Sequence, residues 1–141
     1  MFKFLLNNTR HFALATLTLI GCSGDSGPEL AEVTGTVTLD GSPVAGVNLQ
    51  FTPESEDGSP SYGVTDADGQ YELLYSIDRS GAMPGKHRVE ILPAEPNTDD
   101  SGKPVASSVM TLIPTRYTQP GTLTADIQSG SNTVDFALQS K

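Results

Sequence analysis

The fold class of this 141-residue chain is decided by residues 64–73, which read Val-Thr-Asp-Ala-Asp-Gly-Gln-Tyr-Glu-Leu. Polar turn residues occupy the centre, and apolar residues alternate with polar ones on each side. Asp bonds its own backbone two residues on, and Gly takes positive φ without steric cost. The stretch therefore predicts a tight hairpin turn between two antiparallel strands, Tyr62–Val64 and Tyr71–Leu73, with Tyr71, Leu73 and Tyr75 on one face.

A calcium loop is the alternative for the same turn, because Asp66, Asp68 and Gly69 match the start of an EF-hand loop. An EF-hand needs further oxygen ligands, flanking helices and a bidentate Glu at its twelfth position. The twelfth residue counted from Asp66 is Ile77. The sequence therefore favours a plain turn, and we expect neither a metal site nor a cofactor.

Composition and charge limit the classes of partner. With 14 Gly and 10 Pro the chain is rich in turns, and its length suits one domain. The net charge of −9 becomes −11 if residues 1–21 are removed, because they hold Lys3 and Arg10 and no acid. Nucleic-acid binding requires a basic footprint, so we expect no nucleic-acid partner. The acidity also argues against electrostatic docking on anionic lipid.

Residues 1–21 are expected to be a helical lipoprotein signal peptide. Lys3 and Arg10 give a positive start, and residues 12–20 form an apolar core too short to span a bilayer. The Leu-Ile-Gly-Cys sequence that ends at Cys22 resembles the bacterial lipobox. That resemblance implies cleavage between Gly21 and Cys22 and a lipid on the Cys22 sulfur.

Cys22 is the only cysteine, so the domain must fold without disulfides. Several acyl chains on one residue would anchor the protein stably to a membrane. A buried thiol and an unlipidated secretory peptide are the alternatives. Residues 22–31 are Gly/Ser-rich and are expected to be a flexible tether. We expect the protein in the cell envelope, and Ser23 after the cysteine favours the outer membrane or periplasmic face.

Residues 32–139 are expected to form one all-β domain. The expected strands share period-two alternation of apolar and polar residues and lie at 33–39, 47–52, 62–64, 71–75, 86–91, 123–127 and 134–138. Seven short strands at this spacing predict an antiparallel β-sandwich. The last two are expected to form a C-terminal hairpin around Ser129–Asn132.

Two single residues with polar side chains are expected to be structural. His87 is the only histidine after residue 21, and it shares an apolar face with Val89 and Ile91. Without a cysteine or second histidine to complete a site, we expect a packed, hydrogen-bonded residue. Tyr117 is expected to pack at a strand start with its hydroxyl bonded.

The loops at 53–60 and 93–109 are where a partner site would be sought, although a tolerated insertion is the alternative for the longer one. Their carboxylate pairs, Glu54/Glu56 and Asp99/Asp100, are conceivable hydrolytic groups, but they are expected to be solvated because adjacent acids on loops usually are. The tyrosines of the domain are expected to face mostly inward, which disfavours a glycan site. An exposed edge strand is a further route to a partner chain.

The order of motifs resembles the carboxypeptidase regulatory-like domains. Val33–Val37 followed by Asp40–Val44 is similar to the opening of that family, and the 65–71 turn and Pro84–Val89 are similar to its next two motifs. The 113–117 and 130–136 motifs look like those of short lipoproteins abundant in planctomycete-type bacteria. The resemblance covers residues 32–139 and implies a transthyretin-like, Greek-key sandwich.

The resemblance implies little about activity, because in the carboxypeptidases this domain accompanies a separate zinc catalytic domain. We therefore expect a membrane-anchored, non-catalytic envelope lipoprotein with a binding or structural module and no catalytic residues. An envelope protein or a glycan is the expected partner. The alternative is a small hydrolase of the hydroxyisourate-hydrolase branch, which uses a His/Arg/His set and a Tyr-Arg-Gly-Ser-like C-terminus. After residue 21 the chain has His87 as its one histidine, and it ends Leu138-Gln139-Ser140-Lys141, which disfavours the hydrolase.

Overall fold

The computed structural model describes residues 27–92, 97–98, 101, 104–105 and 112–141. Its strands are β1 (Glu32–Leu39), β2 (Ser42–Pro43), β3 (Asn48–Pro53), β4 (Ser61–Val64), β5 (Gln70–Glu72), β6 (Leu74–Ser76), β7 (Arg79–Ser80), β8 (Gly85–Leu92), β9 (Asn97–Thr98), β10 (Pro104–Val105), β11 (Leu123–Ile127), β12 (Ser131–Thr133) and β13 (Phe136–Leu138). A short 3-10 helix, η1 (Thr115–Thr118), precedes β11. Each of the seven predicted strand segments contains a strand, so the all-β expectation is confirmed.

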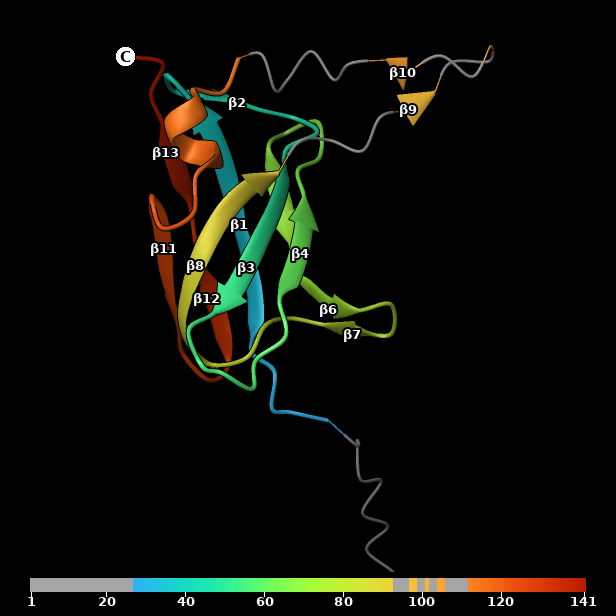
Figure 1. Cartoon of the computed structure of the whole chain (residues 1–141), viewed down its shortest axis with the longest axis vertical. Helices are drawn as coiled ribbons and strands as arrows, with labels where there is room; N and C mark the ends of the chain where they lie inside the picture. The colour runs from blue at the N-terminus through green and yellow to red at the C-terminus, as the bar shows by residue number, and fades with distance from the viewer. Residues whose placement is uncertain (1–26, 93–96, 99–100, 102–103, 106–111) are drawn as a thin grey trace, which may run out of the picture.

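Two sheets form the sandwich (Figure 1). In the first sheet, β1 pairs with β2 and β5 along one side and with β12 and β13 along the other. The second sheet has the order β11-β8-β3-β4-β6-β7. The β-sandwich expectation is therefore confirmed. Two pairings depart from the antiparallel pattern, because β12 and β13 both run parallel to β1.

The core lies between the sheets and follows the predicted alternation. Val33 and Val37 of β1 face Leu49 and Phe51 of β3 in one buried cluster. Phe51 is central, with ring centroids 6.1 Å from Tyr71 and 6.0 Å from Phe136. Burial of each such side chain contributes roughly 1.5–3 kcal/mol, which is what replaces disulfides in a domain of this size.

The 66–69 turn exists, but the predicted hairpin is wrong. The Asp66 carboxylate accepts the backbone N–H groups of Asp68 and Gln70, each at 2.9 Å, and Gly69 has φ +74°. However, β4 pairs with β3 and β6, whereas β5 pairs with β1. The turn carries the chain from the second sheet to the first, because the Gly69 carbonyl accepts the N–H of Val37 in β1.

The predicted C-terminal hairpin is also wrong. β11 pairs with β8, and the 128–131 turn then takes the chain across to β1 in the other sheet. The Asn132 side-chain amide shapes this turn by bonding both backbone groups of Gln128, and it also donates to the Glu32 carbonyl. Alternation along a strand identifies its buried face, but it says nothing about which strand lies beside it.

The predicted strand at 71–75 is divided. Leu73 is fully buried at the corner where the chain leaves β5 in the first sheet and enters β6 in the second. As a result Tyr71 and Leu73 face inward as predicted, while Tyr75 is only half-buried.

The 93–109 segment lies mostly outside the described residues. Its described part includes β9 and β10, which pair as a two-stranded antiparallel sheet, so those four residues are not irregular. The described ranges contain no helix long and apolar enough to cross a membrane.

Candidate functional site

A groove of about 1010 Å³ lies where the chain changes sheets at β4, β5 and β6. One wall is apolar. Tyr62 and Val64 point outward from β4 and are 47% and 59% exposed, and Leu74 of β6 is paired directly opposite Tyr62 and is 48% exposed. Ile77, in the turn between β6 and β7, extends this wall and is 95% exposed.

The other wall is polar. It is formed by outward-facing residues of the first sheet, namely Thr34 and Thr36 of β1, Gln70 and Glu72 of β5, and Thr133 of β12. Five large apolar side chains are exposed in the described part of the chain, and four of them line this groove. Contiguous exposed apolar surface marks interaction sites, so this is the strongest candidate surface.

Close packing at the corner creates the groove. A Cβ built on Gly63 would lie 3.1 Å from both the Glu72 carbonyl oxygen and a Leu73 methyl carbon. Glycine at this position therefore lets β4 approach the β5–β6 corner closely. Since Leu73 takes the inward position, its neighbour Leu74 must point outward.

The lining carries negative charge. Among the residues that line the groove, Asp66 and Glu72 are acidic and none is basic. The Asp66 carboxylate is held by the turn, whereas the Glu72 side chain is exposed and its carboxylate has no hydrogen-bond or ion-pair partner among the described residues. The floor includes Tyr71, whose hydroxyl donates to the Val134 carbonyl at 2.6 Å. Burial, and secondarily the Asp135 carboxylate, raises the pKa of Tyr71.

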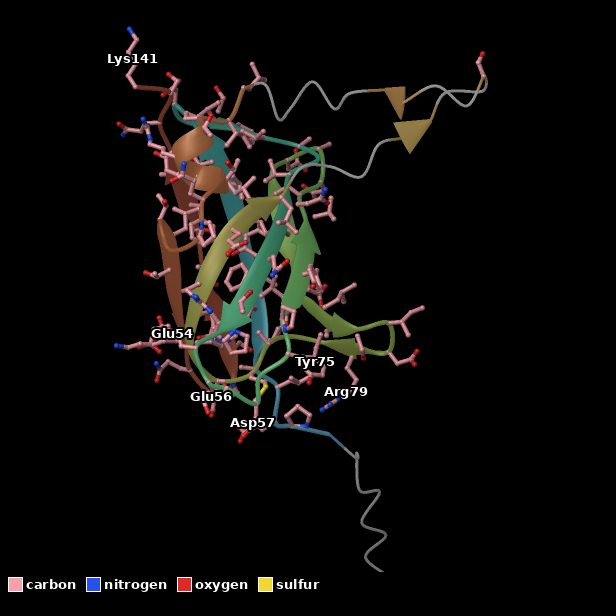
Figure 2. The ribbon with its side chains drawn as sticks, viewed as in Figure 1. Glu54, Glu56, Asp57, Tyr75, Arg79 and Lys141 are labelled. Carbon is pink, nitrogen blue, oxygen red and sulfur yellow. The ribbon has the colours of Figure 1, made fainter. Side chains whose placement is uncertain are left out.

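The β6–β7 hairpin beside the groove also contacts the segment that precedes β1. Arg79 of β7 donates to the Pro28 carbonyl at 2.7 Å, and its guanidinium carbon lies 5.8 Å from the centroid of the Tyr75 ring. Tyr75 itself lines the groove. Figure 2 shows Tyr75 and Arg79 beside the point where the chain enters the sandwich. One wall of the groove is therefore fastened to the segment that follows residue 26.

His87 is a structural residue, as predicted. It is fully buried on β8, and its Nε2 lies 2.7 Å from the Met83 carbonyl oxygen, to which it donates. Its Nδ1 is buried without a hydrogen-bond partner among the described residues, and its ring packs 6.2 Å from Phe51.

The structure does not bring the other sequence candidates together. Glu54, Glu56 and Asp57 are exposed on the β3–β4 loop, at the end of the sandwich where the chain enters β1 (Figure 2), and none lines the groove. Asp99 and Asp100 lie outside the described residues, as do Gly21 and Cys22. No group of three His, Cys, Asp or Glu side chains within the described ranges could hold a metal ion.

The expectation of inward-facing tyrosines is wrong for Tyr62, which is half exposed on the groove wall. One sequence signal could have located this site. The adjacent residues Leu73 and Leu74 interrupt period-two alternation, and two successive residues of a strand cannot both face the core. One of them must therefore be exposed, as Leu74 is.

A second polar cluster fastens the C-terminus. Arg116 donates to the carbonyls of Gln139 and Lys141, and its guanidinium lies over the Tyr117 ring at 4.8 Å. The Tyr117 hydroxyl accepts bonds from Arg116 and the Gln139 N–H, which together lower the pKa of Tyr117. The hydrogen bonding predicted for Tyr117 is confirmed, but the residue lies in η1 and not at a strand start.

Asp40 takes part in the same closure. Its carboxylate accepts the Ser140 N–H at 3.0 Å, and bonding to Ser140 lowers the pKa of Asp40. These contacts bind backbone groups of the chain itself, which is the pattern of a structural clasp.

No family model and no curated protein matches this chain. Among solved structures, it is similar to a DUF3823 family protein from Parabacteroides merdae, at 13% identity and a TM-score of 0.46, covering 79% of this chain and 46% of that one. It is also similar to BcpA, the major pilin subunit of Bacillus cereus, at 12% identity and a TM-score of 0.46, covering 81% and 31%. A 9R-lipoxygenase from Cyanothece matches at 15% identity and a TM-score of 0.39, covering 77% and 17%. The chain spans less than half of each of these proteins, and the similarities are too distant to transfer a function.

Proposed function

We propose that this protein is a non-catalytic lipoprotein of the cell envelope that presents a binding groove close to its membrane anchor. The lipid is carried on Cys22, residues 22–31 are the tether, and the sandwich is a carboxypeptidase regulatory-like domain. The observation that carries the proposal is the groove with one apolar wall. The β6–β7 hairpin beside this groove also contacts the proposed tether, through the hydrogen bond from Arg79 to the Pro28 carbonyl. A site held this way stays near the proposed anchor, because Cys22 lies only six residues before Pro28 in the sequence.

The geometry of His87 supports a non-catalytic role. A general base must come within hydrogen-bond reach of the proton that it abstracts. His87 is fully buried and already bonded to the Met83 carbonyl. The hydrolase alternative, which needs an accessible His/Arg/His set, is correspondingly disfavoured.

The positions of the family motifs support the finer assignment. The opening motif falls on β1 and β2, and the central motif forms the observed turn into β5. The Pro84–Val89 motif is the entry of β8, and the 130–136 motif is the crossover into β12 and β13.

The anchor is tested by intact mass and detergent partitioning of the protein from its native membrane. We expect a chain beginning at residue 22 with a lipid-sized mass increment that partitions into detergent, and both properties should be lost in Cys22→Ser. Ser23→Ala, one residue away, is the matched control and should behave as wild type. A soluble wild-type protein with an unmodified thiol would overturn the proposal.

A further inference from the structure

We infer that the groove between β4, β5 and β6 binds an extended segment of another protein in which apolar and basic side chains alternate. This inference rests on the proposed function in one respect, because it names the partner of the binding module. The anchor itself plays no part in the recognition.

The two walls of the groove differ in chemistry. Tyr62, Val64 and Leu74 supply the apolar wall, with Tyr62 and Val64 two residues apart on the same strand. Thr36, Gln70 and Glu72 stand on the polar wall. A ligand that fills the groove must therefore present an apolar face on one side and a hydrogen-bonding face on the other.

An extended polypeptide meets this requirement through its own geometry. Its successive side chains point to opposite faces, and residues two apart lie about 6.6 Å apart, the same repeat as in the wall of β4. A helix carries one apolar stripe with a period of about 3.6 residues, and this does not match a wall with period two. The groove volume of about 1010 Å³ is at the upper end of the range for compact ligands, roughly 300–1,000 Å³, and suits a segment of chain.

Charge decides which polar residues the segment carries. The lining has two carboxylates and no basic residue, and Glu72 is without a partner among the described residues. A lysine or arginine on the polar side of the ligand would face Glu72, whereas an acidic residue would be repelled. Arg79, the nearest cation of the hairpin, is bonded to the Pro28 carbonyl and lines a separate hollow with the tether.

The same charges argue against a second copy of this chain as the occupant. The chain has a net charge of −9, so two copies repel each other and add further acids to an acidic groove. A glycan could stack on the exposed Tyr62 ring, but it is disfavoured because most of the exposed apolar wall is aliphatic. Val64, Leu74 and Ile77 offer sugars neither a flat aromatic face nor a hydrogen bond.

The test is calorimetric titration of the purified full-length protein, in detergent, with three defined probes. The first is a peptide of alternating valine and lysine, the second replaces each lysine with glutamate, and the third is a mixture of envelope oligosaccharides. We expect the basic peptide to bind and the other two probes not to bind.

The variants place the binding in the groove. Glu72→Lys should weaken the basic peptide by about tenfold and produce measurable binding of the acidic peptide. Val64→Ser should weaken the basic peptide by about threefold to tenfold through lost apolar contact. Both positions are exposed, so the fold should be retained. Glu56→Lys makes the same charge change outside the groove and should alter the affinity by less than about twofold.

Four results would overturn the inference. They are binding of neither peptide, equal binding of both peptides, competition by the oligosaccharides, or a concentration-dependent dimer that Val64→Ser abolishes. None of these results depends on the lipid. A titration that contradicts the peptide preference therefore leaves the proposed lipid anchor untouched. An anchor experiment that contradicts lipidation likewise leaves the peptide preference of the groove to be decided by the titration.

Discussion

At the scale of single residues, Tyr71 connects the core to the candidate groove. Its ring packs against Phe51 and Phe136, with centroids 6.1 and 6.5 Å away. Its hydroxyl donates to the Val134 carbonyl, and one edge of the residue lines the groove floor. The sequence predicts its inward direction from alternation with Leu73. It does not predict the hydroxyl's partner, which is 63 residues away.

Tyr71→Phe should change the pH dependence of stability. Burial raises the pKa of Tyr71 above its ordinary value of 10.0, so above pH 10 the folded chain keeps a proton that the unfolded chain releases. Wild-type stability should therefore fall above pH 10, with a slope of up to about 1.4 kcal/mol per pH unit from this group. Near neutral pH the variant should be about 1 kcal/mol less stable, because it lacks the hydrogen bond. Urea unfolding should show this deficit shrinking above pH 10.

The exposed Tyr62→Phe is the control for this measurement. Its hydroxyl has no hydrogen-bond partner among the described residues, so its stability difference from wild type should be small near neutral pH. A deficit of Tyr71→Phe that stays constant from neutral to alkaline pH would contradict the role assigned to burial.

At the scale of elements, the final strand is interrupted between β12 and β13, and side chains repair the interruption. The Thr36 N–H is accepted by the Asp135 carboxylate at 2.8 Å, in place of a backbone carbonyl. The Val134 carbonyl turns to accept the Tyr71 hydroxyl, and it lies so close to β1 that a Cβ on Gly35 would be 1.8 Å from its oxygen. Gly35 is therefore a glycine because the interrupted strand crosses directly over it.

Gly35→Ala should destabilise the domain by about 3 kcal/mol or more, because the new methyl group meets a backbone carbonyl that cannot move aside without breaking the β1 pairing. Gly41→Ala is the matched control. Gly41 has φ +86° with nothing within 4 Å of a built Cβ, so the control carries backbone strain alone, about 1–2 kcal/mol. Urea unfolding of both variants gives the comparison. A Gly35→Ala loss no larger than that of the control would refute the steric argument.

Elements were predicted better than their partners. Alternation identified the buried faces of β1, β3 and β8 correctly, including the inward direction of His87. In a strand with one solvent-exposed face, polar and apolar side chains must alternate every two residues. Both hairpins were predicted wrongly, because the turns at 66–69 and 128–131 have hairpin chemistry but their flanking strands bond to β1. The groove was not predicted either. The adjacent Leu73 and Leu74 indicate that one apolar side chain is exposed, but the meeting of strands from both sheets at Leu73 depends on long-range strand pairing that alternation does not encode.

At the scale of the whole molecule, the first sheet is complete only when the two ends of the domain meet. Several bonds that close it join residues about a hundred positions apart. Examples are the contacts of Glu32 with Ser131 and Asn132, and that of Thr36 with Asp135. Such non-local contacts make folding dependent on the final segment, because one edge of β1 has no strand to pair with until β12 and β13 are present.

A chain ending at Gly130 should therefore fail to fold. It lacks β12 and β13, and with them the buried side chains of Phe136 and Leu138, whose loss costs roughly 2–5 kcal/mol each. It also leaves the Tyr71 hydroxyl without its acceptor. These losses together approach the whole stability of a typical domain, about 5–15 kcal/mol.

A chain ending at Gln139 is the control: it keeps β13 and loses only exposed contacts, so it should unfold cooperatively close to the wild-type urea midpoint. Far-ultraviolet circular dichroism distinguishes the outcomes. If the chain ending at Gly130 retained a cooperative transition, the closure of β1 by the final segment would be an accessory feature, and the parallel pairing would not be what completes the fold.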